Sequence, residues 1–282
     1  MKIKLRYLNK YFITRLHKAF NTIALVILSL ITCACGISLE RDSAPTGSID
    51  TSSIPDAIPR VEQRSPYGNP ESYTVYGKRY YVMKGSAGFV ESGIASWYGK
   101  KFHGRRTSSG ETYDMYAMTA AHKTLPLPTY AEVTNLENRK RVIVRVNDRG
   151  PFHDNRIIDL SYTAASKLGI IANGTGLVEV RVIDPANYPG KGAPVRTVSL
   201  EKGGVSGFYI QVGAFSQLVN AEELRKKLGS IGQQLVNISQ AVVGGQTLYR
   251  VRIGPLVSID NADKIVDQLA QLGINDHQVV ID

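Results

Sequence analysis

Two regions of the chain have a regular pattern of apolar and polar positions, and aperiodic stretches separate them. Between Gly93 and Asp184 short alternating runs follow one another, which is typical of strands with one buried face. Four of these runs predict strands, at Tyr130–Asn135, Lys140–Asn147, Arg156–Leu160 and Leu177–Ile183, the first two joined across Glu137-Asn138. About 90 residues with many short strands and little helix predict a small closed β-barrel, because closure removes exposed strand edges.

One helix in this region is indicated by both of its ends. Ser161 is a suitable N-cap, Tyr162–Leu168 carries the helix, and Gly169 stands where a left-handed residue ends it.

The second patterned region contains an internal repeat with an offset of 41 residues. The offset aligns Phe208–Gly213 with Tyr249–Gly254 and Asn220-Ala221 with Asn261-Ala262. Each half reads as strand, helix, strand, so the region predicts a βαββαβ domain with two helices on one face of a sheet. The expected fold class is therefore a mainly β barrel followed by an α+β domain.

Strand parity assigns side chains to the two faces of that second sheet. Phe208, Ile210 and Val212, with their equivalents in the repeat, should lie under the helices. The opposite face then carries Tyr209, Gln211, Arg250 and Arg252. Such a face suits a polar polymer, and an ordinary solvated face is the alternative.

The remaining segments indicate export and tethering. Residues 1–34 combine a basic stretch, a short apolar run and small residues, as a secretory signal peptide does. The only two cysteines, Cys33 and Cys35, end this leader; an uncleaved membrane anchor is the alternative. Residues 35–72 predict a flexible tether, 73–92 a hairpin leading into the barrel region at 93–184, 185–206 a second linker, and 207–282 the repeat domain.

The net charge of +10 first suggests a nucleic-acid partner. Six of the basic residues precede the first acidic one, and removal of that leader leaves a net charge of about +4. We therefore expect no nucleic-acid partner.

Candidate chemistry is concentrated between Gly93 and Pro151. Val142, Val144 and Val146 share one side of their strand, and Asp148 continues that series, which predicts an acid at the mouth of the apolar barrel face. The alternative is that Asp148 only accepts hydrogen bonds from its own Asp-Arg-Gly-Pro turn. His122 and Glu111 are further candidates, although a lone His is more often structural and Glu111 follows a turn where acids are commonly solvated.

The same stretch offers little for a metal or a cofactor. It has no cysteine and no His-x-x-x-His spacing, so we expect no metal site and no cofactor. Trp97 and Tyr98 are either core residues or rings that stack on sugars, and the pattern does not choose.

Three motifs of this stretch resemble the double-psi β-barrel of the rare lipoprotein A family. They read GIASWYGKKFHGRRTSSGE, TAAHKTLP and VRVNDRGPF. A SPOR peptidoglycan-binding domain is resembled by GFYIQVGAF and YRVRIGP. The end of the leader resembles a lipobox, in which Cys35 after Ala34 is the better lipidation site and Cys33 is the competing one. The resemblance implies a lytic transglycosylase of the division septum that acts on peptidoglycan glycan strands, preferring strands without stem peptides. It also implies a lipid anchor in a bacterial membrane, most simply the outer membrane, and proteins of the division site as further partners.

The family's active-site residues fall on Glu111, His122 and Asp148. A lytic transglycosylase closes the sugar's own hydroxyl onto its anomeric carbon, so one acid can protonate the leaving oxygen and later accept the hydroxyl proton. We assign that role to Asp148. Glu111 and His122 orient the substrate or set the protonation of this acid. Trp97 and Tyr98 are assigned to substrate binding, and the wall polymer is assigned to Tyr209, Gln211, Arg250 and Arg252. The competing interpretation is a wall-binding lipoprotein of the division site without catalysis, because a fold does not dictate a function.

Overall fold

The computed structural model describes residues 42–47, 49–188, 207–232 and 234–281 of the 282-residue chain. The predicted leader with Cys33 and Cys35, and all but the first four residues of the predicted linker 185–206, lie outside these ranges. Within the described ranges, no helix has the length and apolar character needed to cross a bilayer.

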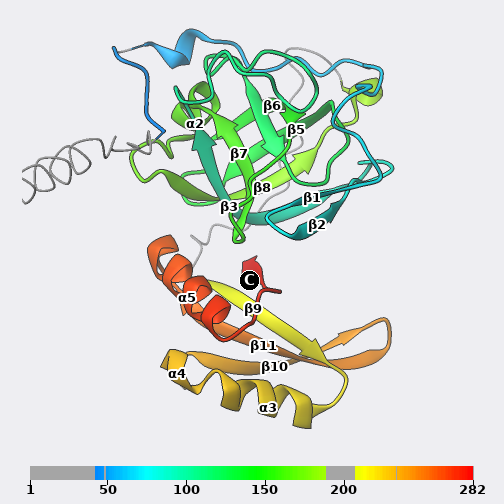
Figure 1. The fold of residues 1–282 in the computed structure, drawn as a ribbon, viewed down its shortest axis with the longest axis vertical. Coiled ribbons are helices and arrows are strands. Elements are labelled where there is room, and N and C mark those ends of the chain that lie inside the picture. The colour runs from blue at the N-terminus through cyan, green and yellow to red at the C-terminus, as the bar shows by residue number, and fades with distance from the viewer. Residues whose placement is uncertain (1–41, 48, 189–206, 233, 282) are drawn as a thin grey trace, which may run out of the picture. The chain divides into compact units, whose positions relative to one another are not determined.

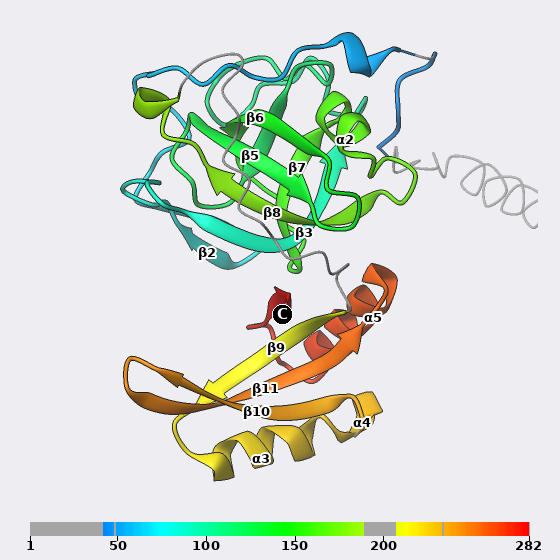
Figure 2. The same ribbon diagram turned by 180° about the vertical axis from the view of Figure 1, so that it is seen from behind.

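Six strands form the closed barrel that the strand pattern predicted (Figures 1 and 2). They are β3 (Val90–Tyr98), β4 (Thr119–His122), β5 (Thr129–Asn135), β6 (Arg141–Asp148), β7 (Arg156–Ser161) and β8 (Thr175–Val182). Around the barrel they run in the order β3-β7-β4-β6-β5-β8, and the β3–β7 and β4–β6 pairs are parallel. The barrel is filled by alternate residues of these strands, including Val142, Val144 and Val146 of β6 and Ile158 and Leu160 of β7.

Helix α2 (Tyr162–Leu168) has the predicted ends. The Ser161 hydroxyl accepts a hydrogen bond from the amide of Ala164, and Gly169 has φ 81°.

The hairpin before the barrel is also present, as β1 (Ser72–Val75) and β2 (Lys78–Tyr81). Its turn lies at Tyr76-Gly77, and both residues have positive φ, as this tight turn requires.

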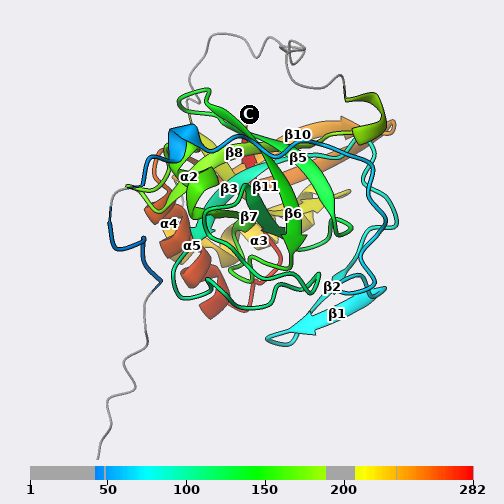
Figure 3. The ribbon, with the colours of Figure 1, turned by 90° about the horizontal axis from the view of Figure 1, so that it is seen from above.

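Residues 49–71, here called the strap, are held against the barrel by hydrogen bonds. For this segment the prediction of a flexible tether over 35–72 is wrong. The strap begins with one turn of 3-10 helix at Thr51–Ser53 and runs along the barrel, blue to cyan in Figure 3. The amide of Ala57 donates to the Ile143 carbonyl, the amide of Ser65 donates to the Leu127 carbonyl, and Lys167 pairs with Asp56. These contacts replace the apolar periodicity that the segment lacks, so hydrogen bonding orders it.

The C-terminal domain has the predicted repeat architecture. Its elements are β9 (Phe208–Phe215), α3 (Leu218–Lys227), the short α4 (Gly229–Gly232), β10 (Val236–Val243), β11 (Gln246–Leu256), α5 (Ile259–Gln271) and β12 (Gln278–Ile281). The antiparallel sheet has the order β10-β11-β9-β12. Ile210, Val212, Val251 and Ile253 pack with the apolar residues of α3 and α5, as parity predicted.

Candidate functional site

Asp148 lies at the end of β6, where the register with β4 changes. Ala120 pairs with Val146, but the next residue of β4, Ala121, pairs with Asp148, so Asn147 is an extra residue on β6. Ala120 is in the barrel core and Ala121 is on the opposite side of β4. Asp148 therefore shares the outer side with Ala121, and the expectation that it continues the apolar series of Val142, Val144 and Val146 is wrong. The bulge, which reverses the parity, is the reason.

The Asp148 carboxyl is held by the preceding loop and by its own turn. Its Oδ1 atom accepts hydrogen bonds from the Ser108 amide, the Ser108 hydroxyl and the Arg149 amide, each at 2.7 Å. Among the described residues Oδ2 has no hydrogen-bond donor, and the side chain is partly exposed. One oxygen is thus anchored and the other is open to a ligand. Ser108 was missed by sequence analysis, and its place in the turn-forming Thr107–Gly110 was the one signal for it.

A second acid, Asp159 of β7, was missed by sequence analysis and lies on the same side of the barrel. Ser96 of β3 pairs with Asp159, Asp159 pairs with Ala121 of β4, and Ala121 pairs with Asp148. The Ser96 hydroxyl donates a hydrogen bond to Asp159. Asp159 stands at a polar position between Ile158 and Leu160, which was the one sequence signal for it.

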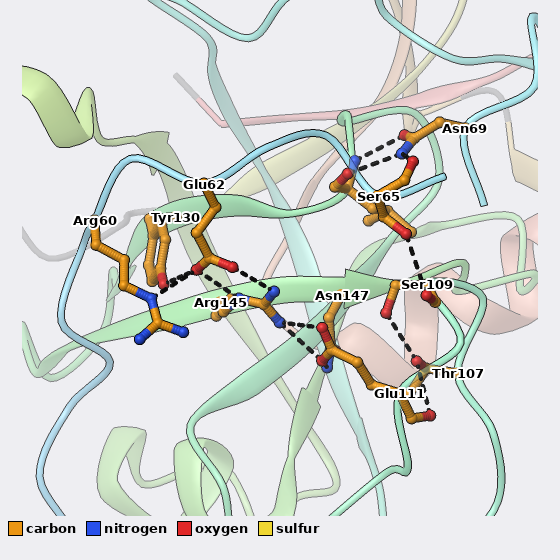
Figure 4. Close-up of polar contacts among 11 residues, drawn as sticks. Arg60, Glu62, Ser65, Asn69, Thr107, Ser109, Glu111, Tyr130, Arg145 and Asn147 are labelled. Carbon is orange, nitrogen blue, oxygen red and sulfur yellow. Dashed lines mark hydrogen bonds and ion pairs between the residues drawn. The ribbon is translucent and has the colours of Figure 1, made fainter. Parts of the chain in front are cut away.

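Glu111 lies in a charged network with Arg145, Asn147 and Glu62 (Figure 4). Both carboxylate oxygens accept from Nη1 of Arg145 at 2.8 Å, and Oε2 also accepts from the Asn147 amide nitrogen at 2.7 Å. Arg145 extends to Glu62 of the strap, where Nε and Nη2 donate at 3.0 and 2.8 Å. Glu111 therefore contacts the bulge residue next to Asp148, and no hydrogen bond between described residues joins the two carboxyls.

His122 is on the inner side of β4 and is 2% exposed. It pairs with the core residue Ile158, and its Nδ1 accepts from the amides of Thr124 and Leu125 at 3.2 and 3.1 Å. Nε2 lies 3.5 Å from Oε2 of Glu91. Burial lowers the pKa of His122, and Glu91 opposes that shift.

The structure connects His122 to the site through Arg149. The guanidinium donates to the carbonyls of His122 and Leu125 at 3.1 and 2.6 Å and to the Gly68 carbonyl of the strap at 2.8 Å. His122 thus shapes the loop that holds Arg149, the neighbour of Asp148 in sequence. The three predicted catalytic residues converge on one segment of backbone, while their side chains do not meet among the described contacts.

The two ring residues are mostly packing residues. Tyr98 is 8% exposed and stacks on Tyr113 with 4.1 Å between ring centroids. Trp97 is partly buried and makes an edge contact with Tyr162. A buried, stacked face offers little to a sugar, so the geometry favours the core interpretation for Tyr98.

In the C-terminal domain, Arg252 contacts two of the other three predicted polymer-binding residues. Nε of Arg252 donates to the Gln211 side chain at 3.3 Å, and its guanidinium lies 5.8 Å from the centroid of the Tyr209 ring. Arg250 has the strand parity of Arg252 and pairs with Ala214. The described part of the chain contains no group of three His, Cys, Asp or Glu residues that could hold a metal ion.

Two family models match the chain and agree with this architecture. Residues 90–182 match a model described as a lytic transglycolase domain, and residues 204–280 match the SPOR domain. The barrel is thus a double-psi β-barrel, and the class is that of a peptidoglycan-acting protein with a barrel and a SPOR domain.

Curated relatives identify the family. Proteins named endolytic peptidoglycan transglycosylase RlpA are 42% identical in Pseudomonas aeruginosa, over 83% of this chain and 83% of that protein, and 41% identical in Vibrio cholerae, over 88% and 92%. The chain belongs to the RlpA family. A crystal structure of the RlpA SPOR domain from Pseudomonas aeruginosa is 36% identical over 27% of this chain and all of that one, with a TM-score of 0.26.

Proposed function

We propose that this protein is an endolytic peptidoglycan lytic transglycosylase that cleaves glycan strands and leaves anhydromuramyl ends, with Asp148 as its catalytic acid/base. The observation that carries the proposal is the hydrogen bonding of the Asp148 carboxyl. Oδ1 accepts three hydrogen bonds, whereas Oδ2 accepts none from the described residues. The strand partner of Asp148 is Ala121, which has a small side chain. Membership of the RlpA family supports the reaction class.

The reaction needs no external nucleophile. The carboxyl donates a proton to the leaving glycosidic oxygen, and the muramic acid C6 hydroxyl attacks C1 of the same sugar. The hydroxyl proton then returns to the protein, so no water is consumed. Ordinary glycosidases need separate groups for water and leaving group.

Glu111 and His122 act in this proposal as positioning residues. Glu111 fixes the bulge residue Asn147 and also Arg145, two residues before it, and His122 fixes the loop that receives Arg149. Displacement of a catalytic group by about 1 Å can cost about 100-fold in rate, so their loss is expected to be damaging.

The test is digestion of purified glycan strands with analysis of the product ends. Asp148→Asn keeps the shape of the side chain and removes its titratable proton, so turnover is expected to fall by about 10²–10⁴ while strand binding persists. Asp114→Asn is the matched control, since Asp114 is an exposed acid in the same domain that caps the Tyr116 amide. Free reducing ends from the wild type would mean a hydrolase, and no cleavage would favour a wall-binding module.

We further propose a preference for strands without stem peptides and action at the division septum through the SPOR domain. Digestion of matched peptide-bearing and stripped strands tests the first, and equal rates would contradict it. Imaging of a fluorescent fusion with and without residues 207–282 tests the second, and unchanged septal enrichment would contradict it.

We also propose that a lipid on Cys35 anchors the protein in the outer membrane, facing the periplasm. Both cysteines, Cys33 and Cys35, lie outside the described residues. Mass spectrometry of the N-terminal peptide decides it, because a lipid on Cys33 or an intact leader would give a different mass.

A further inference from the structure

The row Ser96, Asp159, Ala121, Asp148 places two carboxyls on one side of the barrel with a methyl group between them. Each member pairs directly with the next across β3, β7, β4 and β6, and directly paired residues point to the same side of a sheet. Neighbouring strands lie about 4.8 Å apart, so the two Cα atoms stand roughly 10 Å apart. A glycosidic bond that lies over Ala121 would therefore stand between the two carboxyls.

Two further observations put the Asp159 carboxyl at the turn that follows Asp148. A Cβ atom placed on Gly150 would lie 3.8 Å from Oδ2 of Asp159 and 3.9 Å from Cβ of Ala121. Gly150 has φ 134°, a conformation that excludes most other residues. The Asp159 carboxyl therefore lies beside backbone that carries no side chain. The charges of Asp148 and Asp159 also both add to the rise that burial causes in the pKa of Tyr98, which places the three groups in one neighbourhood.

We infer that Asp159 is a second catalytic carboxyl, the acid that protonates the leaving glycosidic oxygen, and that Asp148 is the base that takes the proton of the C6 hydroxyl. The inference rests on the proposed lytic transglycosylase reaction and divides between two residues the work first given to Asp148 alone. The bond from C1 to the leaving oxygen breaks and the bond from O6 to C1 forms. Asp159 ends as a carboxylate and Asp148 as an acid, and proton exchange restores both.

The surroundings of Asp159 suit a proton donor. Burial raises the pKa of its carboxyl, and the hydrogen bond from Ser96 opposes that rise. The side chain is still partly exposed, as a group that touches substrate must be. The other charged or titratable groups near it are Arg156, Lys123 and His153, which lower its pKa, together with Tyr98 and Tyr113 and, across Ala121, Asp148.

The pH profile distinguishes a proton donor from a structural acid. A general acid must be protonated, so activity is lost as pH rises through its pKa. Ser96→Ala removes the hydrogen bond that lowers the pKa of Asp159, so that pKa rises and the alkaline limb of kcat/KM against pH moves to higher pH. Ser92→Ala is the control, because Ser92 is on the same strand and has no described hydrogen bond to an acid. This variant should leave the alkaline limb of kcat/KM where it is in the wild type.

The experiment uses the full chain, stripped glycan strands, and the Asp159→Asn, Ser96→Ala and Ser92→Ala variants. Asp159→Asn is expected to lose about 10²–10⁴ in turnover and to keep strand binding. Turnover within a few-fold of wild type, or an alkaline limb that Ser96→Ala does not move, would overturn the inference. If Asp159→Asn fails to fold, the position of the alkaline limb in the pH profile of Ser96→Ala decides whether the inference holds. Wild type without anhydromuramyl products would instead refute the proposed function.

Discussion

At the residue scale, the ion pair of Glu62 with Arg145 joins the strap to the barrel and contributes to stability. Hydrogen bonds from Arg145 lower the pKa of Glu62 to about 2, from an ordinary value of 4.5, against the opposing effect of burial. The folded-state pKa is the lower one, so the stabilisation is complete above about pH 4.5 and is lost as pH falls toward 2. The strap is therefore held to the barrel by a charge that persists at moderately acid pH.

We predict that Glu62→Gln lowers the free energy of unfolding by about 1–3 kcal/mol at pH 7. The difference from wild type should shrink between pH 4.5 and 2, as measured by thermal melts across that range. Arg60→Gln is the control, because Arg60 pairs with the same carboxylate but is 73% exposed, and exposed ion pairs contribute little to stability. A constant difference at all pH values would show that charge is not the cause.

At the element scale, the strap contacts the site through Gly68. Its carbonyl accepts from Arg149, and a Cβ atom at this position would lie 2.6 Å from the Ser108 carbonyl oxygen. Ser108 supplies two of the three hydrogen bonds to Asp148. Any displacement of this contact is therefore transmitted to the Asp148 carboxyl.

Gly68→Ala is expected to reduce kcat/KM at least tenfold, because the new methyl group must displace the Ser108 loop. Gly88→Ala is the matched control: its φ of 72° is close to the 75° of Gly68, but nothing lies within 4 Å of the added atom. Both variants should lose about 1 kcal/mol of stability from backbone strain. Equal activity in the two would contradict a role for the strap in the site.

Elements with strong alternation or clear ends were predictable from sequence, and elements defined by long-range contacts were not. The β5, β6, β7 and β8 strands and the Ser161-capped helix were all predicted. The β3 and β4 strands were missed, since Gly, Ser and Ala dominate SGIAS and TAAH and their pairing partners lie far along the chain. The bulge at Asn147 depends on pairing with β4, and for that reason parity placed Asp148 on the wrong side.

At the scale of the whole molecule, the SPOR domain should bind wall polymer through Gln211 and Arg252. In the full chain carrying Asp148→Asn, which prevents digestion, adding Gln211→Ala and Arg252→Ala should weaken pull-down by glycan strands roughly tenfold, or about 1.4 kcal/mol. Gln246→Ala, an exposed change on the same strand, is the control. Unchanged pull-down with a folded domain would move the binding surface to another face.

The strap also bears on where the catalytic module begins. The matched family region starts at residue 90, but Arg145 and Arg149 take hydrogen bonds to Glu62, Gly68 and Asn69, all upstream of that boundary. A fragment cut at residue 90 would keep every barrel strand. It would leave Nε and Nη2 of both partly buried guanidinium groups without these acceptors, at about 1–3 kcal/mol for each unsatisfied group. The unit that could be recombined with other wall-binding domains, or expressed alone as an enzyme, therefore runs from residue 49 to about residue 184.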